Sequence, residues 1–141
     1  MVLVILLEKE NLGEILTDEE IKKIVSAGFS APLEYVRTVH FNKRIPELKN
    51  IYKPSLKNGN IKIHDGNKWK TVDQEKIINN LYDKSKDLVE DNIEGIEDTK
   101  GYKIMSTRTW LDEDNNNPDG KNIKGVKKNI KLELHNNKDI L

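Results

Sequence analysis

The sequence predicts an α+β fold with two short N-terminal helices, a three-stranded antiparallel meander, a long helix and C-terminal helices. Three observations predict it. The hydrophobic period changes from helical to alternating after Ile51, two tight-turn signals bracket the alternating stretch, and a helical period returns afterwards. Residues 1–141 are expected to form a single domain, because a chain of this length can bury one core of ordinary size.

Capping residues predict the two N-terminal helices. The TDEE motif at residues 17–20 has the spacing of a capping box, which predicts a helix over residues 18–27. Gly28 follows where a left-handed C-cap is expected. Pro32 is tolerated in a first helical turn, so a second helix is predicted over residues 32–40.

Alternation and turn chemistry predict the meander. Ile61 and Ile63 point to one face, while Lys62 and His64 point to the other. The Asn-Gly and Asp-Gly pairs on either side favour tight hairpins. Pro54 favours an edge position for the first strand, since proline cannot donate to a ladder. The three strands are expected near residues 50–56, 60–65 and 68–72.

The second half of the chain is predicted to be mainly helical around one loop-rich insertion. Asp73 is a good N-cap, and apolar residues recur at three- and four-residue spacing over 74–91. A short helix is expected over 105–111, inside an insertion near 94–120 that is otherwise rich in turn residues. A last helix is expected from Lys121 to Asn136. Its apolar face comprises Ile123, Val126, Ile130 and Leu134.

Charge is unevenly distributed although the net charge is zero. The blocks 1–42, 43–76, 77–120 and 121–141 carry −3, +5, −6 and +4. The +5 block coincides with the meander, whose solvent side is predicted to bind phosphates of nucleic acid. The candidate nucleic-acid-binding residues are Lys53, Lys62, His64, Lys68 and Lys70. The alternative is a solvated sheet face that lysines protect from edge association.

The last helix carries five lysines around its apolar stripe. A basic amphipathic helix lies on anionic membranes, binds nucleic acid or packs on the core. Gly125 weakens it as an independent helix, so packing against the acidic block at residues 77–120 is the favoured interpretation. No membrane partner is expected. The apolar run at residues 1–7 is too short to span a bilayer, so it is interpreted as a buried strand or a first helical turn. It also lacks the marks of a signal peptide, which favours an intracellular protein.

Few residues suggest chemistry. The absence of cysteine excludes disulfides, thiolate zinc sites and cysteine nucleophiles. His40 and Asn42 have the residue types of a metal-dependent nuclease pair, but an inward-packed helix end explains them as well. The carboxylates at 112–114 are interpreted as an exposed acidic loop rather than a cation site. Trp69 is expected to face the core. We expect no cofactor, no metal and no catalytic residue.

The sequence also resembles a known family. The pattern VHFNxxxPxxxNIY over residues 39–52 continues into IKIHDGNKW over 61–69 and a helix through LYDK at 81–84. With the closing IKLELHNNKDIL at 130–141, it resembles the carboxy-terminal domain of uncharacterised proteins from mimivirus-like giant DNA viruses. The resemblance covers roughly 32–93 and 121–141.

That family often carries an amino-terminal Cys/His zinc finger, which implies a nucleic-acid setting for the relatives that have it. This chain has no cysteine and therefore no such finger, and Lys49 stands where relatives often have histidine. Residues 98–122 have no counterpart in the family pattern. The resemblance implies a location in the host cytoplasm, viral factory or virion, and it implies no enzymatic activity.

The sequence therefore leaves three hypotheses. The first is a non-enzymatic viral module that binds DNA or RNA through the lysine-bearing meander. The second is a protein-interaction or self-assembly module that pairs its acidic and basic blocks with a partner or a second copy. The third is a metal-dependent nuclease built around His40 and Asn42.

Overall fold

The computed structural model describes residues 15–45, 49–64, 66–97 and 103–138. It confirms the α+β class and the predicted order of helices and strands. The first half comprises α3 (Asp18–Val25), a 3-10 turn η1 (Gly28–Ser30), α4 (Ala31–His40), β1 (Ile51–Tyr52), β2 (Asn60–His64) and β3 (Trp69–Asp73). The second half comprises α5 (Gln74–Glu97), α6 (Met105–Asn116) and α7 (Lys121–Asn136). The apolar run at residues 1–7 lies outside the described residues.

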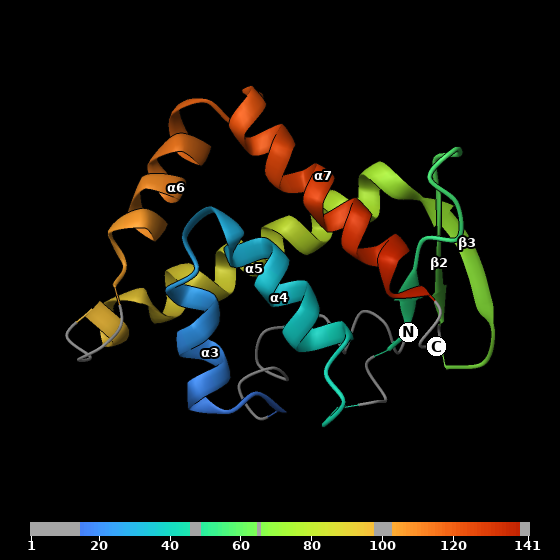
Figure 1. Ribbon diagram of the computed structural model, residues 1–141, viewed down its shortest axis with the longest axis horizontal. Coiled ribbons are helices and arrows are strands. Elements are labelled where there is room, and N and C mark those ends of the chain that lie inside the picture. The colour runs from blue at the N-terminus through green and yellow to red at the C-terminus, as the bar shows by residue number, and fades with distance from the viewer. Residues whose placement is uncertain (1–14, 46–48, 65, 98–102, 139–141) are drawn as a thin grey trace.

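The long helix α5 is the element on which the others pack. In Figure 1 it runs along the molecule from the sheet at one end toward α6 at the other. It contacts α3, α4 and α7 as well as β2 and β3. Its buried apolar residues recur at helical spacing, which places them on one stripe. They are Ile78, Leu81, Tyr82, Leu88, Val89, Ile93 and Ile96.

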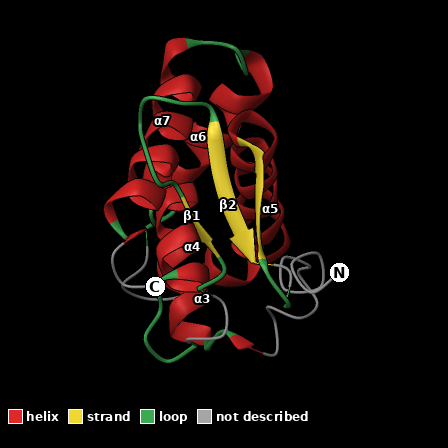
Figure 2. Cartoon of the chain, turned by 90° about the vertical axis from the view of Figure 1, so that its right-hand side faces the viewer, coloured by secondary structure: helices red, strands yellow, loops and turns green. Residues whose placement is uncertain are grey.

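The sheet is the predicted meander, with strand order β1-β2-β3 and both pairs antiparallel. Figure 2 shows the three strands side by side in front of the helices. The register pairs Ile51 with Ile63, and Ile61 with Val72, so these side chains share the face turned toward α5 and α7. β1 lies at an edge, as Pro54 predicted.

β1 is shorter than expected for a definite reason. The amide of Lys53 points away from β2 and donates to the Leu134 carbonyl of α7 at 3.2 Å. Hydrogen-bonding positions alternate along an antiparallel strand, so residue 54 would be the next to donate to β2, and it is a proline without an amide hydrogen. The predicted strand over 50–56 is therefore reduced to residues 51 and 52.

Two helices extend beyond their predicted ends. α5 continues past residue 91 because Ile93 and Ile96 keep the buried stripe in register, and this burial outweighs the turn preference of Gly95 and its acidic neighbours. α6 continues past residue 111 through the buried Asp114. Much of the segment 94–120, expected to be rich in loops, is thus helical.

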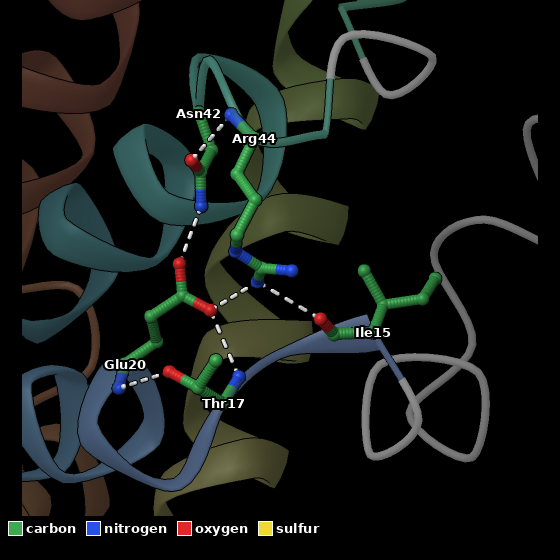
Figure 3. Close-up of polar contacts among 5 residues, drawn as sticks. All are labelled: Ile15, Thr17, Glu20, Asn42 and Arg44. Atoms are coloured by element: carbon green, nitrogen blue, oxygen red, sulfur yellow. Dashed lines mark hydrogen bonds and ion pairs between the residues drawn. The ribbon is translucent and has the colours of Figure 1, made fainter.

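The predicted capping box at the start of α3 forms, and it also binds a distant loop (Figure 3). The Thr17 hydroxyl accepts from the Glu20 amide at 3.1 Å, and Glu20 accepts from the Thr17 amide at 2.8 Å. The Glu20 carboxylate also accepts from the side chains of Asn42 and Arg44 beyond α4. Arg44 reaches on to the Ile15 carbonyl at 2.9 Å. One carboxylate therefore joins the helix start to the segment that leaves α4.

The corner between α3 and α4 is closed by a threonine from α6. Gly28 has the left-handed backbone that the sequence predicted, with φ +66°, although it opens η1 and the C-cap of α3 is Ser26. The Gly28 amide donates to Thr107 Oγ1 at 2.9 Å, and the Thr107 hydroxyl donates to the Val25 carbonyl at 2.6 Å. This buried hydroxyl satisfies two backbone groups that the change of direction leaves open.

The last helix spans the predicted residues, and its apolar stripe is buried as expected. It packs on α4 and α5, and β1 lies against its end. Arg37 of α4 forms an ion pair with Glu133 at 2.8 Å. The favoured interpretation placed this helix against the acidic block, and α5 does belong to that block. However, α4 lies outside the block and makes the more extensive contact with α7.

We predict that Glu20→Gln destabilises the protein in a pH-dependent way. Burial alone would raise the pKa of Glu20, but hydrogen bonds from Thr17, Arg44 and Asn42 outweigh it and lower the pKa below 4.5. The stability contributed by the carboxylate is therefore complete above pH 4.5 and is lost as the pH falls through the lowered folded-state pKa. Urea titrations at pH 7 should show a loss of about 1 kcal/mol.

The matched control is Asp18→Asn, which removes the same charge from the same helical turn without touching this network. Its loss of stability at pH 7 should stay within about 0.5 kcal/mol. Glu20→Gln should show a flatter profile below pH 4.5, because the titrating carboxylate is gone. Parallel profiles for Glu20→Gln and the wild type would contradict the role assigned to this side chain.

We predict that Thr107→Val is strongly destabilising although it conserves side-chain shape. It leaves the Gly28 amide and the Val25 carbonyl buried without their partner, at a cost of about 1–3 kcal/mol for each group. The control is Thr109→Val on the exposed side of the same helix, where the loss should stay within about 0.5 kcal/mol. Equal unfolding free energies of the two variants would show that the Thr107 hydroxyl does not stabilise the corner between α3 and α4.

Candidate nucleic-acid interface

One face of the sheet points away from the helices. The register pairs Tyr52 with Lys62, Lys62 with Thr71, and His64 with Trp69, and directly paired residues share a face. This set alternates with the inward isoleucines. We call the surface formed by Tyr52, Lys62, His64, Trp69 and Thr71 the outer sheet face.

Three aromatic rings form a cluster on the outer sheet face. The Trp69 ring lies 5.0 Å from Tyr52 and 5.1 Å from His64, centroid to centroid. Both pairs are edge-to-face, with interplanar angles of 83° and 78°. Such pairs stabilise each other beyond simple area burial, so they hold the indole in place. Trp69 nevertheless remains 40% exposed.

The expectation that Trp69 faces the core is wrong. Trp69 pairs with His64, so its side chain lies on the outward face of β3. Val72 pairs with Ile61 and lies on the inward face. The signal that would have revealed this was available, because the register of a hairpin follows from its turn. Tyr52 was missed for the same reason, although it alternates with Ile51.

Lys53 does not belong to the outer sheet face, contrary to its predicted solvent position. Its side chain is fully buried, with 0% exposure. Its ammonium donates to the carbonyls of Asn58 and Asn60 at 2.7 and 3.2 Å, which anchors the loop between β1 and β2. Burial, and secondarily the charge of Lys131, lowers the pKa of Lys53. Alternation along the strand would have indicated this inward position, because Lys53 lies two residues after the buried Ile51.

The other four predicted residues lie around the β2–β3 hairpin. Lys62 donates to the Thr71 hydroxyl on the outer sheet face. His64 accepts from the Gly66 amide at 3.1 Å and packs on Trp69. Lys70 pairs with Ile63, so its stem starts from the opposite face, and it is exposed at the sheet edge. Lys68 is exposed in the hairpin turn. The structure thus places Lys62 and His64 on the outer sheet face, with Lys68 and Lys70 at its border.

His40 and Asn42 do not form an accessible nuclease pair. His40 is fully buried, which agrees with the predicted inward-packed helix end. Its Nδ1 lies 3.1 Å from the Asn50 side-chain oxygen. Asn42 donates its amide to Glu20 and accepts the Arg44 amide at 3.0 Å. A general base must come within hydrogen-bond distance of its substrate, which a fully buried imidazole does not offer.

The carboxylates at 112–114 are not the exposed loop that the sequence predicted. They lie in α6, and Asp114 is buried. Asp114 accepts from the Tyr82 hydroxyl at 2.5 Å and from Lys86 at 2.6 Å, while Trp110 donates to the Tyr82 oxygen at 2.9 Å. The hydrogen bond to Asp114 raises the pKa of Lys86. This network joins α5 to α6, and no cluster of metal-ligating side chains occurs among the described residues.

Comparisons of the chain with protein-family models, with curated proteins and with solved structures found no match. Across the part of the chain that the structure describes, none of the helices combines the length and apolar character needed to cross a membrane.

The two tryptophans should report opposite environments. The chain has two, so Trp69→Phe leaves Trp110 as the only emitter, and Trp110→Phe leaves Trp69. Trp110 is fully buried. We expect blue-shifted emission that acrylamide barely quenches in Trp69→Phe, and red-shifted, strongly quenched emission in Trp110→Phe. Circular dichroism serves as the folding control, and equal quenching in both variants would contradict the exposed position of Trp69.

Proposed function

We propose that the protein is a non-enzymatic module that binds single-stranded nucleic acid on its outer sheet face. The observation that supports this most is the exposed indole of Trp69, held between Tyr52 and His64 on the sheet face that also carries Lys62. An exposed aromatic ring kept rigid by its neighbours is a surface on which an unpaired base stacks.

The chemistry of the outer sheet face favours a single strand over a duplex. Every base has an aromatic face, and stacking on a side chain contributes about 1–3 kcal/mol per base, but bases inside a duplex are already stacked. Lys62, with Lys68 and Lys70 at the border, supplies charge for the phosphates.

The same residues favour binding with little sequence preference. Lysine is a compact charge, whereas arginine is the usual bidentate reader of guanine. The nearest arginine in the chain, Arg44, is engaged with Glu20 in the described structure. Contacts would therefore be made to base faces and phosphates rather than to base edges. The resemblance to giant-virus domains supports a location inside an infected cell, in the cytoplasm, viral factory or virion, while its link to nucleic acid belongs to relatives with a zinc finger.

We predict that Trp69→Ala weakens binding of a short oligothymidine or oligouridine by about 1–3 kcal/mol. Fluorescence anisotropy at about 50 mM salt, where phosphate contacts are strongest, measures the affinity. The control is Leu56→Ala, since Leu56 is an equally exposed apolar side chain outside the outer sheet face. Unchanged affinity in Trp69→Ala, or no binding by the wild type at this salt, would overturn the proposal.

We predict that Lys62→Gln changes the salt dependence rather than the stacking. Each phosphate contact on a single strand contributes about 0.7 to the slope of log affinity against log salt, so the slope should fall by about that amount. A salt series on wild type and variant measures it. The same series with a matched duplex should give weaker binding, and tighter duplex binding would argue against a stacking surface.

A further inference from the structure

A second basic surface lies away from the outer sheet face, in a groove of about 460 Å³ between the first turn of α5 and one side of α7. Gln74 and Asn79 are among the residues that α5 contributes. The lysines of the opposite wall are Lys124, Lys127, Lys128 and Lys131. This volume lies in the range of sites that hold small ligands.

The spacing of these lysines explains why they meet in one groove. They recur at intervals of three and four residues, which places them on one face of a helix. The adjacent face carries the buried stripe of Ile123, Val126, Ile130 and Leu134. Docking that stripe on α4 and α5 therefore turns the lysine face toward the start of α5.

The positive charge in the groove is only partly neutralised by the acidic residues that line it. None of the four lysines forms an ion pair with any residue that the structure describes. Glu75 and Asp119 also line the groove, so the charged side chains there sum to +2. Like charges at three- and four-residue spacing cost an isolated helix about 0.2–0.5 kcal/mol per pair. An anion in the groove would relieve this repulsion.

One of the lysines is held in position by an aromatic ring. Lys127 Nζ lies 4.9 Å from the centroid of Tyr82, and the Tyr82 hydroxyl is fixed by Asp114. Lys127 is half-buried, whereas Lys124 and Lys128 are exposed. The groove thus combines one ordered cation with two that are free to adjust to a ligand.

The start of α5 adds a favourable dipole but no amide cradle. The Gln74 amide already donates to the Gly59 carbonyl at 2.8 Å, and the Lys76 amide donates to Asp73 at 3.2 Å. Recognition would therefore depend on total charge more than on fixed donor geometry. Affinity should rise from phosphate to pyrophosphate to tripolyphosphate and fall steeply with added salt.

We propose that this groove binds a phosphate-bearing polyanion, either a free polyphosphate chain or a short stretch of nucleic-acid backbone. This site is separate from the outer sheet face and rests on different residues. Its test uses inorganic tripolyphosphate as the probe, with calorimetric titration for affinity and thermal unfolding for stabilisation of the folded state.

The test variant is the double substitution Lys124→Gln/Lys128→Gln, because both side chains are exposed and their loss leaves the core intact. The matched control is Lys43→Gln/Lys103→Gln, which removes two exposed charges outside both the groove and the outer sheet face. We expect the α7 variant to bind tripolyphosphate about tenfold more weakly and to lose most of the thermal shift, while the control keeps both.

Equal affinity in all three proteins, or no binding by the wild type at low salt, would overturn the proposal. A second arm titrates the same proteins with an oligothymidine. Weaker oligonucleotide binding in the α7 variant assigns the groove to nucleic-acid backbone, and unchanged binding assigns it to free polyphosphate. If the proposed function of the outer sheet face is wrong, the separate test will show it, because Trp69→Ala will leave the oligonucleotide affinity unchanged.

Discussion

The fold depends on burial of the apolar stripe of α5. A stripe that continues from Ile78 to Ile96 is too long for one neighbour to cover, so α3, α4, α7 and the sheet each cover part of it. Burying one large aliphatic side chain contributes about 1.5–3 kcal/mol, and no other element offers as many in one row. The positions of the remaining elements follow from how each of them covers this helix.

Both candidate binding surfaces are consequences of that packing. β3 passes into α5 without a loop, so the inward side chains of the sheet are directed to the helices and Trp69 is directed outward. α7 reaches the same end of α5 with its apolar stripe, and its lysines necessarily border the first turn of α5. A helix that buries one face presents the adjacent one at a fixed angle. The packing of the core therefore sets the positions of the elements that carry both surfaces.

Buried polar side chains form the hydrogen bonds and ion pairs that apolar side chains cannot supply. Thr107 satisfies the corner after α3, Lys53 satisfies the carbonyls of the β1–β2 loop, and Asp114 joins α5 to α6 through Tyr82 and Lys86. Each group has partners, as burial of polar atoms requires. Lysine, aspartate and threonine are usually exposed, so a sequence alone predicts that these side chains lie on the surface. They are buried here because the folded chain supplies hydrogen-bond partners for them.

The sequence alone determined the elements whose signals are local: the Thr17 capping box, the alternating burial of β2 and the apolar period of α7 all depend on residues a few positions apart. It did not determine the end of α5 or the burial of Asp114, since each depends on residues distant in the chain. The burial of Lys53 depends on the folded β1–β2 loop, whose Asn58 and Asn60 carbonyls meet its ammonium. The lysine pattern of α7 was visible in the sequence, but only docking of that helix on α5 turned it into a groove. Local interactions select helix or strand, whereas the free energy of burial decides which face each element hides.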